Sequence, residues 1–205
     1  MKYFLKLTIV LLTINIAVSA NNNLISVVKE KYAKITTIQG NFKQNICSES
    51  EGACQQFDGK FSIKRPNFSC LEVIHPDKQI IVTDSTNVYI HLVNKKKVYV
   101  QPANNGLNFF KVFDIFLNAP SKFIVINQEN EWSVLSYKKD TLDESNVFQD
   151  LKLYINNKTN LIEKFSFIDF NSSENTFQLT DIKVNPNLST KLFKFTIPKG
   201  VEVIK

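Results

Sequence analysis

Apolar and polar residues alternate along much of the chain, most regularly between residues 57 and 64. Phe57, Gly59, Phe61 and Ile63 alternate there with aspartate, lysine and serine. Successive side chains of a strand point to opposite faces, so this pattern is typical of an antiparallel strand with one apolar face. We expect the sheet to be organised around this strand.

The alternation stops at Arg65 and Pro66. Proline cannot donate to a strand ladder and favours an extended residue before it, so the pair marks a strand end or an edge. Arg65 then lies at the rim of a concave apolar sheet. A solvated rim arginine is the commoner case, and the alternative is a functional role for its five donors.

Other stretches carry strand patterns separated by asparagine and glycine turns. They span residues 38–46, 68–74, 80–83, 88–92, 97–101, 123–127, 132–137, 147–155, 161–170, 176–184 and 193–197. We expect an all-antiparallel meander that curls into an unclosed, or half, β-barrel, which makes the fold mainly β.

Two segments have helical spacing instead. Residues 24–34 predict an amphipathic helix behind capping asparagines. Residues 107–117 are almost wholly apolar, and an apolar arc that wide is unsuited to the outside of a barrel. We expect this second helix to cover the mouth of the half-barrel as a lid over a hydrophobic cavity; an ordinary plug helix that completes a dry core is the alternative.

The first twenty residues have the features of a secretory signal peptide. Lys2 and Lys6 precede a short apolar core, and Val18, Ser19 and Ala20 form a small-residue cleavage site. Asn21, not a cysteine, stands directly after Ala20, so we expect an unlipidated protein exported to the periplasm. Residues 21–205 then form a single domain.

Cysteines and candidate catalytic groups are sparse. Cys47 and Cys54 flank a polar turn, and a disulfide between them is the favoured pairing, with Cys70 left free. His75 and His91 stand singly on strand-like segments, where surface histidines are commoner than catalytic ones. The chain has no nucleophile elbow, zinc-binding helix motif or phosphate loop.

We therefore expect neither catalytic residues nor a metal site or cofactor, and no enzyme activity. The formal net charge is +6, but the lysines are scattered. Lys95, Lys96 and Lys97 lie between two strand patterns, which favours a solvated turn over a nucleic-acid site. Asp140, Asp143 and Glu144 lie in a polar loop, and a solvated turn again outweighs a calcium or acid/base site.

Several motifs taken in order resemble the periplasmic outer-membrane lipoprotein carrier proteins (LolA-type). They are Phe42-Lys43-Gln44, the run Gly59 to Asn67 with its Lys-Arg-Pro core, Pro76, the hairpin Ile80 to Val88, and the closing Phe193 to Val203. The similarity spans nearly the whole exported chain. Leu71 stands where the family often has an aromatic, and the cysteine-flanked loop is not typical.

The resemblance implies a chaperone that carries acylated lipoproteins from the inner to the outer membrane. An inner-membrane ABC-type complex would supply the cargo and an outer-membrane receptor would accept it; we expect a monomer. In the family, the arginine of the Lys-Arg-Pro run ties the lid shut through bonds to lid backbone, which makes Arg65 and Pro66 the expected latch. A periplasmic binder or sensor of another lipid, with the same fold, is the rival interpretation, and a hydrolase is a more distant one.

The acyl chains are then expected to contact apolar side chains of the sheet and the lid. On the sheet these are Phe42, Phe57, Phe61, Ile63 and Leu71. On the lid they are Leu107, Phe109, Phe110, Phe113, Phe116 and Leu117.

Overall fold

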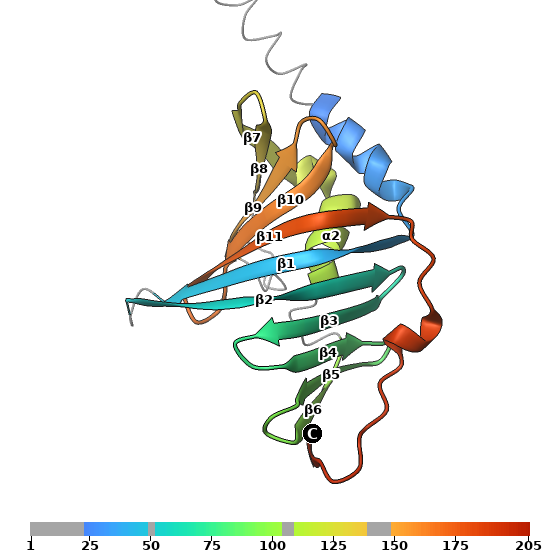
Figure 1. The fold of residues 1–205 in the computed structure, drawn as a ribbon. Helices are drawn as coiled ribbons and strands as arrows, with labels where there is room; N and C mark the ends of the chain where they lie inside the picture. The colour runs from blue at the N-terminus through green and yellow to red at the C-terminus, as the bar shows by residue number, and fades with distance from the viewer. Residues whose placement is uncertain (1–22, 49–51, 104–108, 139–148) are drawn as a thin grey trace, which may run out of the picture.

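A twelve-stranded sheet curls around a helix (Figure 1). The computed structural model describes residues 23–48, 52–103, 109–138 and 149–205. The spatial order of the strands is β12-β6-β5-β4-β3-β2-β1-β11-β10-β9-β8-β7. Their bounds are β1 Thr37–Ser48, β2 Ala53–Lys64, β3 Phe68–His75, β4 Gln79–Thr83, β5 Asn87–Leu92, β6 Lys97–Pro102, β7 Phe123–Gln128, β8 Trp132–Tyr137, β9 Gln149–Asn156, β10 Leu161–Ile168, β11 Ser173–Val184 and β12 Glu202–Ile204.

The strand predicted to organise the sheet pairs on both sides. β2 pairs with β1 over its full length, from Lys64 opposite Thr37 to Ala53 opposite Ser48. It also pairs with β3, and β1 in turn pairs with β11. The β1–β11 pairing joins two antiparallel meanders, β1 to β6 and β7 to β11, into one sheet.

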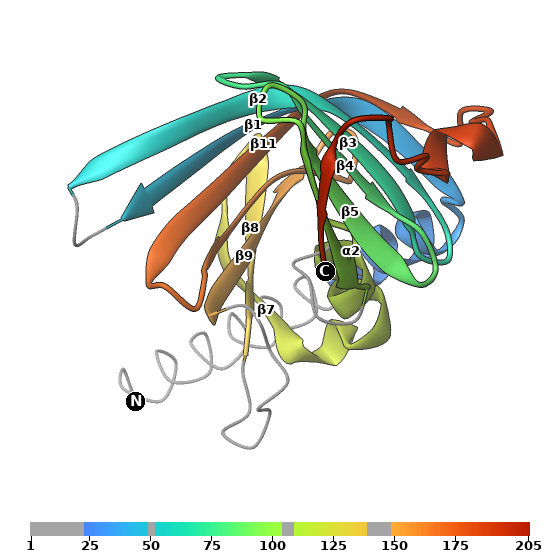
Figure 2. The ribbon, with the colours of Figure 1, turned by 90° about the horizontal axis from the view of Figure 1, so that it is seen from below.

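Helix α2, Phe109–Asn118, connects the two meanders. It follows β6 and precedes β7, with the short 3₁₀ helix η1, Pro120–Lys122, in between. Since β6 lies near one end of the sheet and β7 forms the opposite edge, this connection crosses the concave side. Figure 2 shows α2 beneath the arch formed by β2, β1 and β11.

The N-terminal helix covers residues 23–33, within one residue of the predicted range. Its Val28 and Tyr32 join the same buried cluster as the concave face of the sheet. Within the described ranges, neither this helix nor α2 is long and apolar enough to cross a bilayer.

Two predictions about the C-terminal segment are wrong. Residues 193–197 form no strand: Thr190–Phe193 form the 3₁₀ helix η2, and the chain continues without regular structure. The alternating phenylalanines pack on the opposite face of the sheet rather than pairing at its edge; Phe193 contacts Phe68 and Phe195 contacts Tyr89. The sheet is also not wholly antiparallel, because β12 pairs parallel with β6.

This C-terminal segment buries a second, smaller cluster. Cys70, Val82 and Phe193 form its centre. His91, expected on the surface, is 8% exposed because the ring of Phe195 lies 5.8 Å from it. The sheet thus carries a small covered cluster on its convex face and the main core on its concave face.

Candidate functional site

The concave face brings together all five sheet residues predicted for the cavity. Phe42, Phe61, Ile63 and Leu71 are buried in one apolar cluster, and Phe57 is half-buried against it. Period-two alternation in β1, β2 and β3 turns these side chains to the same face. The sequence prediction therefore places the apolar wall correctly, although contact with acyl chains remains a proposal.

Glycines at two cross-strand positions make this wall close-packed. Gly40 lies opposite Phe61. A Cβ at Gly40 would lie 2.9 Å from the Phe61 ring and 2.7 Å from the carbonyl oxygen of Thr180. A Cβ at Gly59 would lie 2.0 Å from the carbonyl oxygen of Glu72. Side chains at these two positions would displace the Phe61 ring and separate β2 from β3.

Helix α2 fills the space beneath this wall. Val112, Phe113 and Phe116 are at most 3% exposed, and Leu117 is partly buried against the same cluster. The apolar pattern of the sequence therefore places the helix correctly. Leu107, together with the side chains of Phe109 and Phe110, lies outside the described residues.

A series of aromatic rings joins α2 to both neighbouring layers. Phe113 stacks on Tyr32 of the N-terminal helix at 5.6 Å and meets Phe165 of β10 edge-on at 6.4 Å. Phe165 stacks in turn on Phe177 of β11 at 4.7 Å. Three residues of the site could not be predicted from the sequence: Tyr32, Phe165 and Phe177. Their periodicity indicates which face they occupy but not that β1 pairs with β11.

Tyr32 also anchors the N-terminal helix to the sheet. Its hydroxyl accepts a 2.8 Å hydrogen bond from the backbone N–H of Ile162. Burial raises the pKa of the Tyr32 phenol, so the hydroxyl stays neutral. Tyr32 thus holds the N-terminal helix against both α2, through the stack on Phe113, and β10, through the bond from Ile162.

Arg65 lies at the rim, as predicted, beside the lid. Its backbone N–H donates to the carbonyl of Thr36 at 2.9 Å, and Arg65 and Phe113 line the same hollow. No hydrogen bond joins the guanidinium to any residue in the described ranges. The side chain is partly exposed, so the expected bonds to lid backbone are not present within the described part of α2.

The interior between the described part of α2 and the sheet is apolar. The hollow beside Arg65 measures about 20 Å³, close to the space that one water molecule needs. No aspartate, glutamate, lysine or arginine is among the buried residues of the described ranges. The buried side chains of α2 occupy this part of the concave face, so hydrocarbon that binds here has to take their place.

The cysteines adopt the arrangement favoured by the sequence. Cys47 and Cys54 form a disulfide across β1 and β2, and Cys70 is a free, buried thiol. Burial and the nearby Glu72 raise the pKa of Cys70 to about 11, so its nucleophilic thiolate is scarce at neutral pH. The part of the chain that the structure describes contains no cluster of histidine, cysteine and carboxylate suited to a metal ion; Asp140, Asp143 and Glu144 lie outside it.

Comparison with known proteins matches this chain to one family. The family model described as outer membrane lipoprotein carrier protein LolA matches residues 33–196. An outer-membrane lipoprotein carrier protein of Photorhabdus laumondii is 27% identical over 197 residues, covering 93% of this chain and 90% of the relative. A protein of the same name from Haemophilus influenzae is 28% identical, covering 84% and 82%.

Among solved structures, an uncharacterised conserved protein from Thermus thermophilus has a similar fold. The two superpose with a TM-score of 0.52 at 14% identity, covering 88% of this chain and 96% of that one. At this identity the likeness concerns the fold alone.

Proposed function

This chain belongs to the LolA family of outer membrane lipoprotein carrier proteins, and from that premise we propose that it is a periplasmic chaperone that carries lipoproteins to the outer membrane. The observation that carries the mechanism is the position of α2. Its Val112, Phe113 and Phe116 are buried against the concave sheet, while the helix itself takes part in no strand pairing. An acyl chain that enters takes the place of these side chains.

This exchange keeps the binding of cargo reversible. Burying about 14 methylenes of one acyl chain contributes roughly 11 kcal/mol at about 0.8 kcal/mol each. Two or three chains bound at that strength would never be released. Displacing the buried side chains of α2 offsets part of the gain, so the cargo binds less tightly than hydrocarbon burial alone would make it bind.

The proposal extends to the partners and the compartment. Residues 1–20 act as a cleavable export signal, and the exported protein is not lipidated. An inner-membrane ABC-type complex loads the cargo, with its own ATP supplying the uphill step, and an outer-membrane lipoprotein receptor takes the cargo over. The carrier works as a monomer without cofactor, and performs no catalysis.

Arg65 and Pro66 are proposed as the latch of the lid. Support comes from the small hollow that Arg65 shares with Phe113. The guanidinium makes no such bond to the described part of α2, and a charged hydrogen bond to a lid carbonyl would add about 1.5–3 kcal/mol to closure. We expect Arg65→Leu to favour the open lid and to slow delivery to the receptor, with Arg65→Lys intermediate; wild-type delivery by Arg65→Leu would contradict the latch.

Native mass spectrometry tests the carrier function directly. The protein is isolated from the periplasm of cells that synthesise triacylated lipoproteins, and we expect lipoprotein bound in one-to-one stoichiometry. Purified carrier is then added to spheroplasts, where it is expected to release lipoproteins into the soluble fraction. Bound phospholipid without lipoprotein, together with failure to release lipoprotein, would instead identify a binder of another lipid.

A further inference from the structure

Strand β7 forms an open edge of the sheet. It stands at the end of the strand order, and β8 is its one strand neighbour among the described residues (Figure 1). The backbone N–H of Lys138 donates to the carbonyl of Lys122 at 2.7 Å, and in an antiparallel pair such bonded positions alternate with unbonded ones. The main-chain groups of Phe123 and Val125 therefore point away from β8.

Three of these outward groups are available to a partner. The N–H of Phe123 is used, because it donates to the carbonyl of Pro120. The carbonyl of Phe123 and both main-chain groups of Val125 bond to no residue in the described ranges. Unpaired groups along a sheet edge are a template for an added strand.

The side chains of β7 do little to keep another strand away. The strand contains no charged residue and no proline, which are the common protections of an edge. Ile124 and Ile126 are 37% and 49% exposed, so they offer apolar contacts to an added strand. A bulge between Val125 and Asn127 limits a regular ladder to residues 123–125.

The opposite edge, β12, is shorter and charged. It has three residues, and Glu202 forms an ion pair with Lys97 of β6 at 3.1 Å. A charged side chain on so short a strand opposes further pairing. Of the two edges, β7 is thus the one suited to a partner strand.

β7 also contacts the lid. Phe116 of α2 meets Phe123 edge-on at 5.2 Å, and Phe123 meets Tyr137 of β8 at the same distance. Hydrocarbon that takes the place of Phe116 therefore lies against the first residue of β7. The acyl chains of a lipoprotein are attached to one end of its polypeptide, so the polypeptide begins where the chains leave the concave face.

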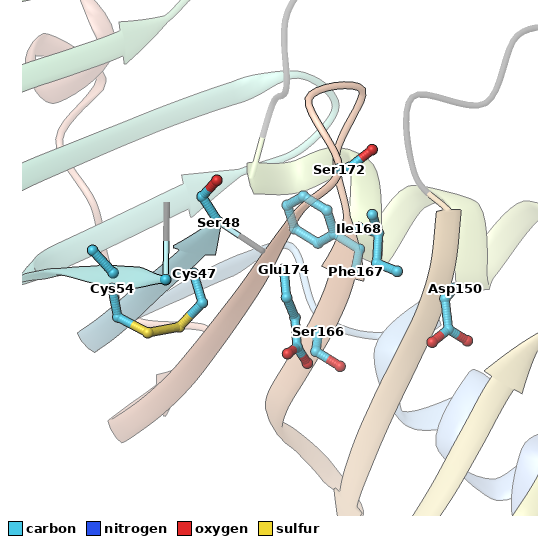
Figure 3. Close-up of a pocket in the computed structure, with 11 residues that line it drawn as sticks. Cys47, Ser48, Cys54, Asp150, Ser166, Phe167, Ile168, Ser172 and Glu174 are labelled. Atoms are coloured by element: carbon cyan, nitrogen blue, oxygen red, sulfur yellow. A yellow bond between two sulfur atoms is a disulfide. The ribbon is translucent and has the colours of Figure 1, made fainter. Parts of the chain in front are cut away.

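The hollow beside the Cys47–Cys54 disulfide gives no comparable indication of a ligand (Figure 3). Its Asp150 is already paired with Lys152 at 2.7 Å. No buried side-chain nitrogen or oxygen in the described ranges is without a hydrogen-bond partner. The open edge of β7 is therefore the stronger candidate for a second contact with a partner.

We propose that the segment of the cargo polypeptide next to its acylated residue binds β7 as an added strand. The proposal rests on the proposed carrier function and assigns the same cargo a second contact. Main-chain hydrogen bonds supply affinity whatever the partner's side chains are. Such a contact suits a carrier, because different lipoproteins share the acyl chains and the polypeptide backbone but not the sequence.

Amide hydrogen exchange of the full exported chain, followed by NMR, tests the proposal. The probe is tripalmitoylated cysteine followed by Ser-Val-Thr-Val-Gly, and the control lipid is tripalmitoylated cysteine amide without the peptide. We expect the probe to slow exchange of the Val125 amide at least tenfold, and the control lipid to leave it unchanged.

Val203 provides an internal reference at the opposite edge. The N–H of Glu202 donates to the carbonyl of Lys96, which turns the amide of Val203 away from β6. We expect its exchange rate to stay the same with either lipid. A change confined to Val125 then locates the peptide at β7.

Two variants separate the N–H of Val125 from its side chain. Both Val125→Pro and Val125→Ala replace the partly buried valine side chain. Only proline removes the outward N–H, which the ladder with β8 does not use. Since one main-chain hydrogen bond is lost, we expect Val125→Pro to bind the probe about fivefold more weakly than Val125→Ala. The two variants are expected to bind the control lipid equally.

A change in the probe gives the same test without altering the carrier. N-methylation of alternate residues of its peptide removes donors that would bond to β7. We expect this probe to bind severalfold more weakly than the unmodified one and to leave the exchange of Val125 unchanged.

The outcomes distinguish this proposal from the carrier function. Unchanged exchange at Val125 with the probe bound, or equal binding of the N-methylated probe, overturns the proposal and leaves the carrier function standing. Failure of both the probe and the control lipid to bind overturns the carrier function and this proposal with it. Protection of Val125 that increases with protein concentration in the absence of lipid would assign the edge to a second copy of this chain, which also overturns the proposal.

Discussion

Replacing Phe113 by alanine distinguishes two roles for α2: a lid that opens for acyl chains, and a plug helix that only completes the core. Phe113 is 3% exposed and lies between the rings of Tyr32 and Phe165, so it fixes α2 against both the N-terminal helix and the sheet. If α2 must leave for acyl chains to enter, a weaker α2 raises the affinity for them. If α2 only completes a core, the substitution lowers stability and nothing else.

The size of the effect follows from burial. Each of the buried side chains Val112, Phe113 and Phe116 contributes about 1.5–3 kcal/mol to docking. Removing the Phe113 ring loses about 2 kcal/mol of this, and the stack on Tyr32 adds about 1 kcal/mol. A total near 3 kcal/mol raises the open population up to about a hundredfold. Because the ring would also contact bound hydrocarbon, we expect a net gain in affinity of about tenfold.

The assay is fluorescence titration with a dansyl-labelled undecanoic acid, together with urea denaturation. Phe113→Ala is expected to bind the probe about tenfold more tightly while its free energy of unfolding falls by about 3–4 kcal/mol. Phe193→Ala is the matched control, since Phe193 is 2% exposed but packs on the opposite face. It is expected to lose similar stability with unchanged probe affinity.

One result would refute the lid. If Phe113→Ala loses stability but binds the probe no better than Phe193→Ala does, α2 does not compete with hydrocarbon. The acyl chains would then require another site, and α2 would be an ordinary core helix.

Three further predictions follow from individual contacts. Tyr32→Phe leaves the buried N–H of Ile162 without its 2.8 Å acceptor, so we expect the free energy of unfolding in urea to fall by about 1–3 kcal/mol. Tyr154 is half-buried, and Tyr154→Phe is expected to change this free energy little. Replacing both Cys47 and Cys54 by serine removes a disulfide that closes a short loop, with a sequence separation of 7. We expect the free energy of unfolding to fall by about 2 kcal/mol, and equal stability of the oxidised and reduced wild type would contradict this. The pKa of Cys70 is raised from 9.0 to about 11 in the folded protein. Its contribution to stability is therefore complete below about pH 9 and is lost as the pH rises through about 11. In thermal denaturation between pH 8 and 11, we expect the melting temperature of Cys70→Ala to lack this part of the decline.

Local patterns predicted the elements of the site well. The period-two alternation in β2 and the apolar run of α2 are set by burial on one face, which sequence records directly. The strand prediction for residues 193–197 failed for the same reason, because Phe193 and Phe195 alternate yet pack flat on the convex face. Alternation reports which side chains are buried and leaves open what buries them.

The pairing of strands that lie far apart in the chain could not be predicted from the sequence. Nothing in the residues of β1 indicates that Phe42 would lie 6.2 Å from Phe177, because that contact depends on β1 pairing with β11. For the same reason, Phe165 and Phe177 could not be assigned to the site.

The topology explains why a lid can exist in this fold at all. Because β1 pairs with β11, the two meanders hold together without the connection from β6 to β7, and α2 can withdraw without breaking a single strand ladder. Its opening therefore costs side-chain contacts of about 2 kcal/mol each, while the sheet keeps its backbone hydrogen bonds. The contact of Phe113 with Tyr32 is a ring stack between α2 and the N-terminal helix. A carrier built this way can exchange aromatic side chains for acyl chains, and back, on an unchanged apolar wall.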